Sequence, residues 1–157
     1  MMSLISALAN VHHQGQFGDF EDKKGDNLLK ISEKKNLLIV QIVQFKNSSI
    51  PIESIDIDGL KLKDSSLNVA FNENTRILWN GPKNWLLVSS KKDLIKSISL
   101  TCKETDFAVT DLSHSRAVIE IEGNYVLEVL KKGSPFNFDI LNKNNSINSL
   151  YKILLSQ

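Results

Sequence analysis

The apolar positions of the chain fall into short runs that predict β-strands more often than helices. Residues 36–45, NLLIVQIVQF, are almost continuously apolar and β-branched, which is typical of a well-buried strand. In residues 49–62, SIPIESIDIDGLKL, Ile55 and Ile57 instead alternate with aspartates. This pattern predicts a half-buried strand that has one solvated face and ends near Gly59. Both strands are compatible with a sheet that has one face covered and one face in water.

The clearest local unit lies at residues 75–90, TRILWNGPKNWLLVSS. Two apolar strands flank the turn-forming cluster NGPKN at 80–84, so this stretch predicts a β-hairpin. Residues 91–100, KKDLIKSISL, follow with apolar side chains at helical spacing. Asp93 lies near the start of this helix, where a carboxylate interacts favourably with the helix dipole. The order strand, strand, helix forms one β-β-α unit.

The same order repeats further along the chain. Residues 107–123, FAVTDLSHSRAVIEIEG, read as a strand, a polar corner and a second strand, and residues 124–133, NYVLEVLKKG, read as a helix. Asn124 is suited to the N-cap, and Gly133 followed by Pro135 marks the end of the helix. The chain therefore predicts an α+β fold of antiparallel sheets with helices on one face and two β-β-α-like units.

The region before the first strand has a different composition. Residues 10–36 are rich in glycine, aspartate and lysine, which is typical of an exposed arm or loop. We therefore expect an N-terminal arm over residues 1–35 and a single α+β domain over residues 36–157.

Charge and composition exclude several classes of function. The 157 residues are 41% hydrophobic and 24% charged, with a net charge of +1 and no basic stripe of the kind that binds nucleic acid. No apolar run approaches the roughly 18–20 residues of a membrane span. The N-terminus lacks the charged region and cleavage signal of an export peptide, and Cys102 is the single cysteine. These features favour a cytoplasmic protein.

The polar corner contains the side chains of a hydrolase triad. In residues 109–123, VTDLSHSRAVIEIEG, strand alternation places Asp111 and Ser113 on one face and His114 on the other. A Ser-His-Asp relay needs the histidine between its two partners, and no Gly-x-Ser-x-Gly elbow surrounds Ser113. We therefore interpret the stretch as a structural corner in which Asp111 or Ser113 caps backbone donors.

Other candidate groups do not form a recognisable site. His12, His13, Asp19 and Glu21 match no zinc spacing, and adjacent histidines in an extended segment diverge. Cys102 has no neighbouring histidine, which indicates an incidental or buried thiol rather than a nucleophile. No G-x-G-x-x-G motif occurs. The sequence thus predicts no catalytic, cofactor-binding or metal-binding residue in this chain.

Three stretches in order resemble the gamma subunit of heterotetrameric sarcosine oxidase. Residues 77–86, ILWNGPKNWL, match the family's I-L-W-x-G-P-x-x-W-L hairpin, and residues 111–116, DLSHSR, match its D-x-S-H-x-R stretch. Residues 132–139, KGSPFNFD, are similar to the turn that follows the family's helix, and residues 6–18 are similar to its opening arm. Ser115 stands where the family typically has glycine, which makes a turn with positive φ less favourable.

The resemblance implies a complex of four different subunits, in which this chain would contact the alpha, beta and delta subunits. Such a complex oxidises sarcosine to glycine and transfers the one-carbon unit to tetrahydrofolate. FAD, FMN, NAD and tetrahydrofolate would belong to the larger subunits, and this subunit would be non-catalytic. Its fold would be similar to the folate-binding domain of aminomethyltransferases. The interface would use the N-terminal arm and the exposed or aromatic positions Trp79, Trp85, Ser113, His114 and Arg116.

The end of the chain departs from that family. The sequence closes with SINSLYKILLSQ at residues 146–157, where the family continues through a further strand and helix. The apolar run LYKILL calls for burial, so we expect either a shortened version of the family or an edge that a partner completes.

Two alternative functions stay open at this point. One is a stand-alone tetrahydrofolate-binding or aminomethyl-transferring protein, for which Asp56, Asp58 or Asp111 would hold the pterin. The other is a small assembly or repair factor that binds folate proteins or flavoproteins transiently.

Overall fold

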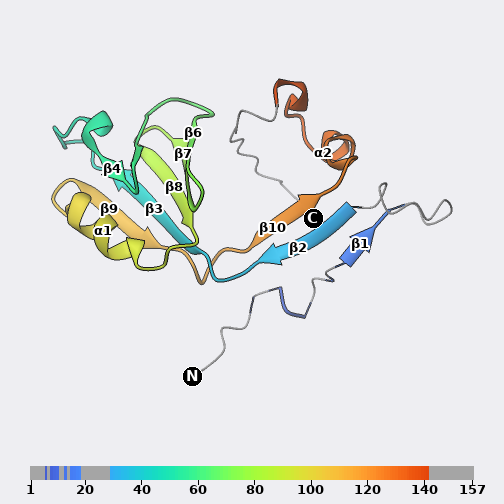
Figure 1. The fold of residues 1–157 in the computed structure, drawn as a ribbon. Coiled ribbons are helices and arrows are strands. Elements are labelled where there is room, and N and C mark those ends of the chain that lie inside the picture. Colours follow the sequence, from blue (N-terminus) through green and yellow to red (C-terminus); the bar gives the residue numbers. More distant parts are fainter. Residues whose placement is uncertain (1–5, 7, 11–12, 14, 19–28, 142–157) are drawn as a thin grey trace, which may run out of the picture. The chain divides into compact units, whose positions relative to one another are not determined.

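The computed structural model describes residues 6, 8–10, 13, 15–18 and 29–141, and the remaining residues are drawn in grey in Figure 1. The chain divides into two compact units. Unit 1 consists of residues 1–35 and 115–140, and unit 2 consists of residues 36–114 and 141–157. Each unit has its own antiparallel sheet.

Unit 2 is built on a sheet of five strands in the order β6-β7-β8-β3-β9. The strands are β3 (Leu38–Gln44), β6 (Val69–Phe71), β7 (Thr75–Gly81), β8 (Asn84–Ser89) and β9 (Phe107–Asp111). Strand β3 lies between β8 and β9 and pairs with both in antiparallel register. The buried strand expected within residues 36–45 and the hairpin expected within 75–90 are both confirmed.

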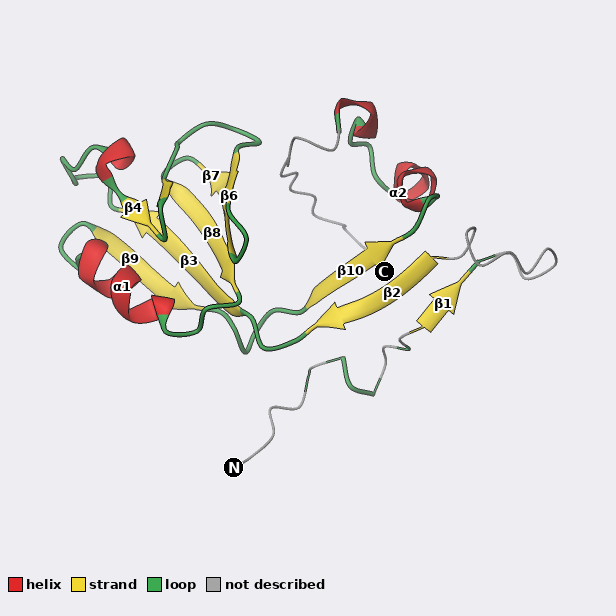
Figure 2. Ribbon diagram, in the orientation of Figure 1, coloured by secondary structure: helices red, strands yellow, loops and turns green. Residues whose placement is uncertain are grey.

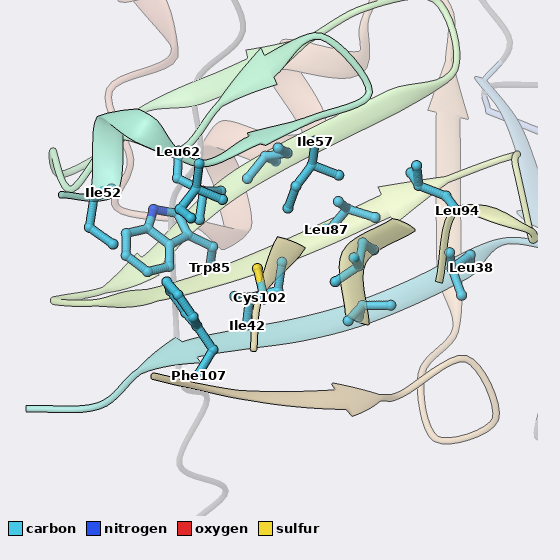
Figure 3. Close-up of a cluster of buried hydrophobic side chains, with 14 residues drawn as sticks. Leu38, Ile42, Ile52, Ile57, Leu62, Trp85, Leu87, Leu94, Cys102 and Phe107 are labelled. Carbon is cyan, nitrogen blue, oxygen red and sulfur yellow. The ribbon is translucent and has the colours of Figure 1, made fainter. Parts of the chain in front are cut away.

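One face of this sheet is covered by a helix and a small hairpin. Helix α1 (Leu94–Thr101) follows β8, and β4 (Asp56–Ile57) pairs with β5 (Leu60–Lys61) after a short 3-10 turn at Ile52–Ser54 (Figure 2). Their apolar side chains meet those of the sheet in one core, in which the Trp85 ring lies between Leu62 and Phe107 (Figure 3). The buried members of this core are Leu38, Val40, Ile42, Ile52, Ile55, Ile57, Leu62, Ile77, Trp85, Leu87, Leu94, Ile98, Cys102 and Phe107.

The half-buried strand expected within residues 49–62 ends before Gly59 as predicted, but it is shorter than expected, because it covers only Asp56–Ile57 and follows a 3-10 turn at Ile52–Ser54. Ile55 and Ile57 are buried, as their alternation with aspartate predicts. The chain nevertheless reverses at Asp58 and Gly59, which have φ values of 57° and 77°. Two consecutive positive φ values are typical of the two-residue turn that Asp-Gly favours, so the segment is a tight hairpin rather than one strand.

Unit 1 has a smaller sheet in the order β1-β2-β10. Its strands are β1 (Gly15–Phe17), β2 (Leu29–Lys34) and β10 (Val118–Glu122), and both pairings are antiparallel. Helix α2 (Val126–Gly133) and a 3-10 turn at Phe138–Ile140 follow β10. The helix begins after Tyr125 rather than at the expected N-cap Asn124.

The second β-β-α unit exists in element order but not in pairing. Strand β9 pairs with β3, whereas β10 pairs with β2 along all five of its residues, from Val118 opposite Lys34 to Glu122 opposite Lys30. The stretch 109–123 is therefore not a hairpin. Its two strands belong to different sheets, because β10 pairs with β2. Strand β2 covers residues 29–34, which we expected in an exposed arm.

This pairing also changes the grouping of the chain. Residues 115–140 gather with residues 1–35, so the units differ from the expected arm of 1–35 and single domain of 36–157. The fold class itself is confirmed at the level of an α+β protein with antiparallel sheets and few helices (Figure 2).

Candidate functional site

The corner at the end of β9 is held by Asp111 and Ser113. One carboxylate oxygen of Asp111, Oδ1, accepts hydrogen bonds from the Ser113 backbone N–H at 2.9 Å and from its hydroxyl at 2.6 Å. Ser113 Oγ in turn accepts a hydrogen bond from the backbone N–H of Ile39 at 3.0 Å. The expected capping role of both side chains is thus confirmed.

These contacts set the chemistry of the corner. The Ser113 hydroxyl gives its hydrogen to Asp111, so it is not activated by a histidine base as a catalytic serine would be. The hydrogen bonds from Ser113, first from its hydroxyl and then from its backbone, lower the pKa of Asp111, and the nearby His114 adds a smaller contribution. Asp111 is therefore a carboxylate that stabilises the corner.

His114 and Arg116 project from this corner. Both are exposed, and the chain passes from unit 2 to unit 1 between His114 and Ser115. Ser113 is half-buried by its contacts with Asp111 and Ile39. A role for these residues at an interface stays a prediction.

The two tryptophans of the β7–β8 hairpin differ in their surroundings. Trp85 is 1% exposed, and its indole N–H donates a hydrogen bond to the Lys63 carbonyl at 2.9 Å. Trp79 is half-buried and donates from Nε1 to Asp64 Oδ1 at 2.8 Å. Trp85 therefore belongs to the core and offers almost no surface to a partner, whereas part of Trp79 remains accessible.

A second polar cluster, which the sequence reasoning missed, surrounds Asp58. Its carboxylate accepts hydrogen bonds from Lys91 Nζ at 2.7 Å and from Thr75 Oγ1 at 2.6 Å. Asn72 Nδ2 donates to the same carboxylate at 3.2 Å and to the Asp58 carbonyl at 2.8 Å. Thr75 and Ser89 are buried and lie 2.8 Å apart at their hydroxyls; because Thr75 donates to Asp58, Ser89 donates to Thr75.

This cluster joins the β4–β5 turn to the start and end of the β7–β8 hairpin. The ion pair and hydrogen bonds, with Lys91 the largest influence and Thr75 the next, lower the pKa of Asp58 to about 2. The dipeptide Asp58-Gly59 between alternating apolar residues was the available sequence signal for the turn. No comparable signal indicated which donors would meet the carboxylate.

The other candidates for pterin binding and for nucleophilic chemistry are also accounted for by the fold. Asp56 Oδ1 accepts a hydrogen bond from the Gly59 N–H at 2.9 Å. The carboxylates of Asp56, Asp58 and Asp111 therefore all accept hydrogen bonds that stabilise turns. Cys102 is buried in the core, and burial raises the pKa of its thiol to about 11, which keeps it protonated at neutral pH.

The four residues that were considered as metal ligands and rejected on their spacing lie mostly outside the described residues. His13 is exposed, and His12, Asp19 and Glu21 lie outside the described residues. Within the ranges that the structure describes, no three histidine, cysteine, aspartate or glutamate side chains gather as a metal site would require. Among these residues, too, no helix is long and apolar enough to cross a membrane.

The described residues form an α+β protein with a five-stranded and a two-stranded antiparallel sheet in unit 2 and a three-stranded antiparallel sheet in unit 1, and a capped polar corner follows β9. A solved structure with a similar fold is a chain of the heterotetrameric sarcosine oxidase from Corynebacterium sp. U-96, in complex with pyrrole 2-carboxylate. The TM-score is 0.64 at 23% sequence identity, and the match covers 73% of this chain.

The match spans 60% of the length of that sarcosine oxidase chain. No protein-family model and no curated protein matches this chain. The expected resemblance to sarcosine oxidase is therefore confirmed at the level of the fold.

Proposed function

We propose that this chain is a non-catalytic, gamma-type subunit of a heterotetrameric sarcosine oxidase complex. The observation that carries the proposal is the shared fold over 73% of the chain with a chain of such an oxidase. The motif order in residues 77–86 and 111–116 adds support that is independent of the fold comparison. The complex would oxidise sarcosine to glycine and transfer the one-carbon unit to tetrahydrofolate.

In this proposal the cofactors belong to the partners. FAD, FMN, NAD and tetrahydrofolate would be held by the larger subunits, and the present chain would bind those subunits through its surface. The proposal includes a similarity of fold to the folate-binding domain of aminomethyltransferases, without a functional folate pocket here. The engagement of Asp56, Asp58 and Asp111 in turns is consistent with this role.

The polar corner that follows β9 is one candidate contact in the complex. His114 and Arg116 are exposed cationic or hydrogen-bonding side chains on a capped, well-defined turn. Trp79 is half-buried and is another expected interface residue, and Ser113 holds the turn by accepting a hydrogen bond from the backbone N–H of Ile39. Trp85 takes no part, because it is buried.

Co-expression tests the proposal directly. The full chain is produced with the alpha, beta and delta subunits of a sarcosine oxidase from the same source, and the complex is purified through a tag on the alpha subunit. We expect this chain to co-elute in equal amounts with each of the others, as measured by intact-complex mass spectrometry. Its failure to co-elute under conditions that assemble the other subunits would contradict the proposal.

A titration separates the proposal from a stand-alone folate protein. The isolated chain is titrated with tetrahydrofolate, and binding is followed by quenching of tryptophan fluorescence. We expect no saturable change at high micromolar ligand, because the three candidate carboxylates are bonded within the fold. Saturable binding would favour the folate-binding alternative. In the co-expression experiment, sub-stoichiometric co-elution would instead favour a transient assembly factor.

A further inference from the structure

The sheet of unit 1 has two chemically different faces. Strand β10 places Val118, Glu120 and Glu122 on one face. On that face Lys30 Nζ lies 2.9 Å from Glu122 Oε2, and Lys34 Nζ lies 2.6 Å from Glu120 Oε2. These cross-strand ion pairs neutralise the charges of the polar face and suit it to water.

The opposite face is apolar. Phe17 of β1 lies opposite Leu29, and Ile121 lies opposite Ile31. Ile119 lies opposite Glu33 and is 40% exposed, while Phe17 is 38% exposed. This face thus presents large apolar side chains that the rest of unit 1 leaves partly uncovered.

Glu33 also lies on this face, but its carboxylate is paired within unit 1. Its side chain is only 8% exposed, and one carboxylate oxygen accepts a hydrogen bond from the Ser6 hydroxyl. The other oxygen lies 3.8 Å from Lys35 Nζ. A surface that covers this face therefore needs no cation of its own and can be apolar itself.

Helix α2 shows the same lack of burial. None of its residues is buried, and Leu127 and Val129 are 39% and 45% exposed. Among the described residues of unit 1, the buried hydrophobic side chains are Leu29 and Phe138. Unit 2, in contrast, encloses a core of many apolar residues. Since burial of apolar surface supplies most of the driving force for folding, unit 1 is the part of the molecule that gains most from a partner.

We propose that the apolar sheet face of unit 1, formed by Phe17, Ile31, Ile119 and Ile121, docks onto an uncharged apolar surface of a larger partner subunit. The inference rests on the proposed function, because a different chain is favoured over a second copy by the heterotetrameric assembly of the fold relative. Glu33 is the charged residue that β2 places on this face, and its carboxylate is already paired with Ser6 and Lys35, which favours an apolar partner surface over a basic one. The inferred docking surface is the sheet of unit 1, and it is distinct from the candidate contact at His114 and Arg116.

One substitution adds charge at the centre of this face without breaking the sheet. In Ile119→Lys the new ammonium group lies opposite Glu33 across the β2–β10 pair, where opposite charges are tolerated. The matched control is Leu100→Lys on α1 of unit 2, because Leu100 is 79% exposed and the change in charge is the same. A second variant, Phe17→Lys on β1, tests the same face from another strand.

Each variant is co-expressed with the alpha, beta and delta subunits, and the amount of this chain that co-elutes is measured. We expect Ile119→Lys and Phe17→Lys to reduce co-elution about tenfold or more, since a lysine in a desolvated apolar contact is strongly unfavourable. Leu100→Lys should co-elute like the unchanged chain. Circular dichroism of the isolated variants, together with amide hydrogen exchange in peptides that cover β2 and β10, establishes that unit 1 is still folded.

The outcomes distinguish this inference from the proposed function. If the unchanged chain does not co-elute, the proposed function fails and the docking surface fails with it. If the unchanged chain, Ile119→Lys and Phe17→Lys all co-elute equally, the docking surface alone is wrong. An isolated chain that forms a dimer, and that Ile119→Lys converts to a monomer, would instead assign the face to a second copy and overturn the inference.

Discussion

At the scale of single residues, carboxylates hold the turns of this molecule in place. Asp58 joins the β4–β5 turn to Thr75 and Lys91, and Asp111 joins the end of β9 to Ser113. Each accepts several hydrogen bonds in its ionised form, which is the reason that the pKa of each is lowered. Their stabilising effect therefore depends on pH.

Asp58→Asn tests that dependence. A carboxyl group with a lowered folded-state pKa stabilises the protein above its ordinary pKa of 3.8, and this contribution is lost as the pH falls to about 2. We expect Asp58→Asn to be less stable than the unchanged chain at neutral pH, with the difference shrinking below about pH 4. Urea unfolding followed by circular dichroism at several pH values measures it.

Lys91→Gln serves as the companion variant for Asp58. Lys91 is the largest cause of the lowered pKa of Asp58, so its removal should raise that pKa and shift the loss of stability toward higher pH. An unchanged pH profile in both variants would contradict the assigned role of the carboxylate.

Ser113→Ala tests the corner. The substitution leaves the Ile39 N–H without the acceptor that Ser113 Oγ provides and removes one donor from Asp111. We expect a loss of about 1–3 kcal/mol in the free energy of unfolding, the usual cost of an unsatisfied buried donor. The exposed Ser66 provides the control Ser66→Ala, which should change stability by less than about 0.5 kcal/mol. Equal effects of the two substitutions in urea unfolding would contradict the capping role.

The hydrogen-bonding role of a side chain could be predicted from the sequence only where its partners are close to it in the chain. Asp111 and Ser113 are two residues apart, so their capping role followed from the corner pattern alone. The partners of Asp58 lie 14 to 33 positions away, at Asn72, Thr75 and Lys91. Their contact depends on how the β4–β5 hairpin folds over the sheet, which no local pattern specifies.

At the scale of elements, the two helices have the same length but different burial. Leu94 and Ile98 of α1 are buried in the core of unit 2, whereas no residue of α2 is buried. Both helices have apolar residues at helical spacing, so the sequence predicted two similar helices. The difference comes from the surfaces that each helix meets.

Alanine substitutions compare the helices. Ile98 is 0% exposed, and Ile98→Ala should lower the free energy of unfolding of the isolated chain by about 2–5 kcal/mol through lost burial and a residual cavity. Leu127 is 39% exposed, and Leu127→Ala should cost less than about 1 kcal/mol. Thermal or urea unfolding of both variants measures the contrast, and a large effect of Leu127→Ala would show that α2 is packed against a surface after all.

The strands show which element predictions depend on long-range pairing. Strands β3, β7 and β8 were predictable because they are strongly apolar and because a turn-forming cluster separates β7 from β8. Strand β2, LKISEK, has only two apolar residues and was taken for part of an arm. It forms a strand because it pairs with β10, which is far along the chain. The pairing is supported by the ion pairs Lys30–Glu122 and Lys34–Glu120 and by the apolar residues of both strands.

At the scale of the whole molecule, the two units differ in how well their cores are closed. Unit 2 has a core around Trp85 and Phe107, and unit 1 leaves Phe17 and Ile119 partly exposed. Local opening costs least where few apolar side chains are buried. The isolated chain should therefore not unfold as a uniform body.

Amide hydrogen exchange measures this difference. In the isolated chain, peptides that cover β3 and β8 should exchange more slowly than peptides that cover β2 and β10, by about tenfold or more. Exchange in β2 and β10 should slow when the partner subunits are added, while that in β3 and β8 stays unchanged. Equal protection of both sheets in the isolated chain would contradict the contrast between the units.

The pairing of β2 with β10 has a consequence for the order in which the protein is completed on the ribosome. Lys34 pairs with Val118, so β2 emerges about 80 residues before its partner strand. The five strands of the large sheet of unit 2, which are β3, β6, β7, β8 and β9, all lie within that interval. The sheet of unit 2 can therefore form while β2 still waits, and the apolar face of unit 1 comes together last. A newly made chain thus presents that face only after the strands of its better-closed unit have been synthesised.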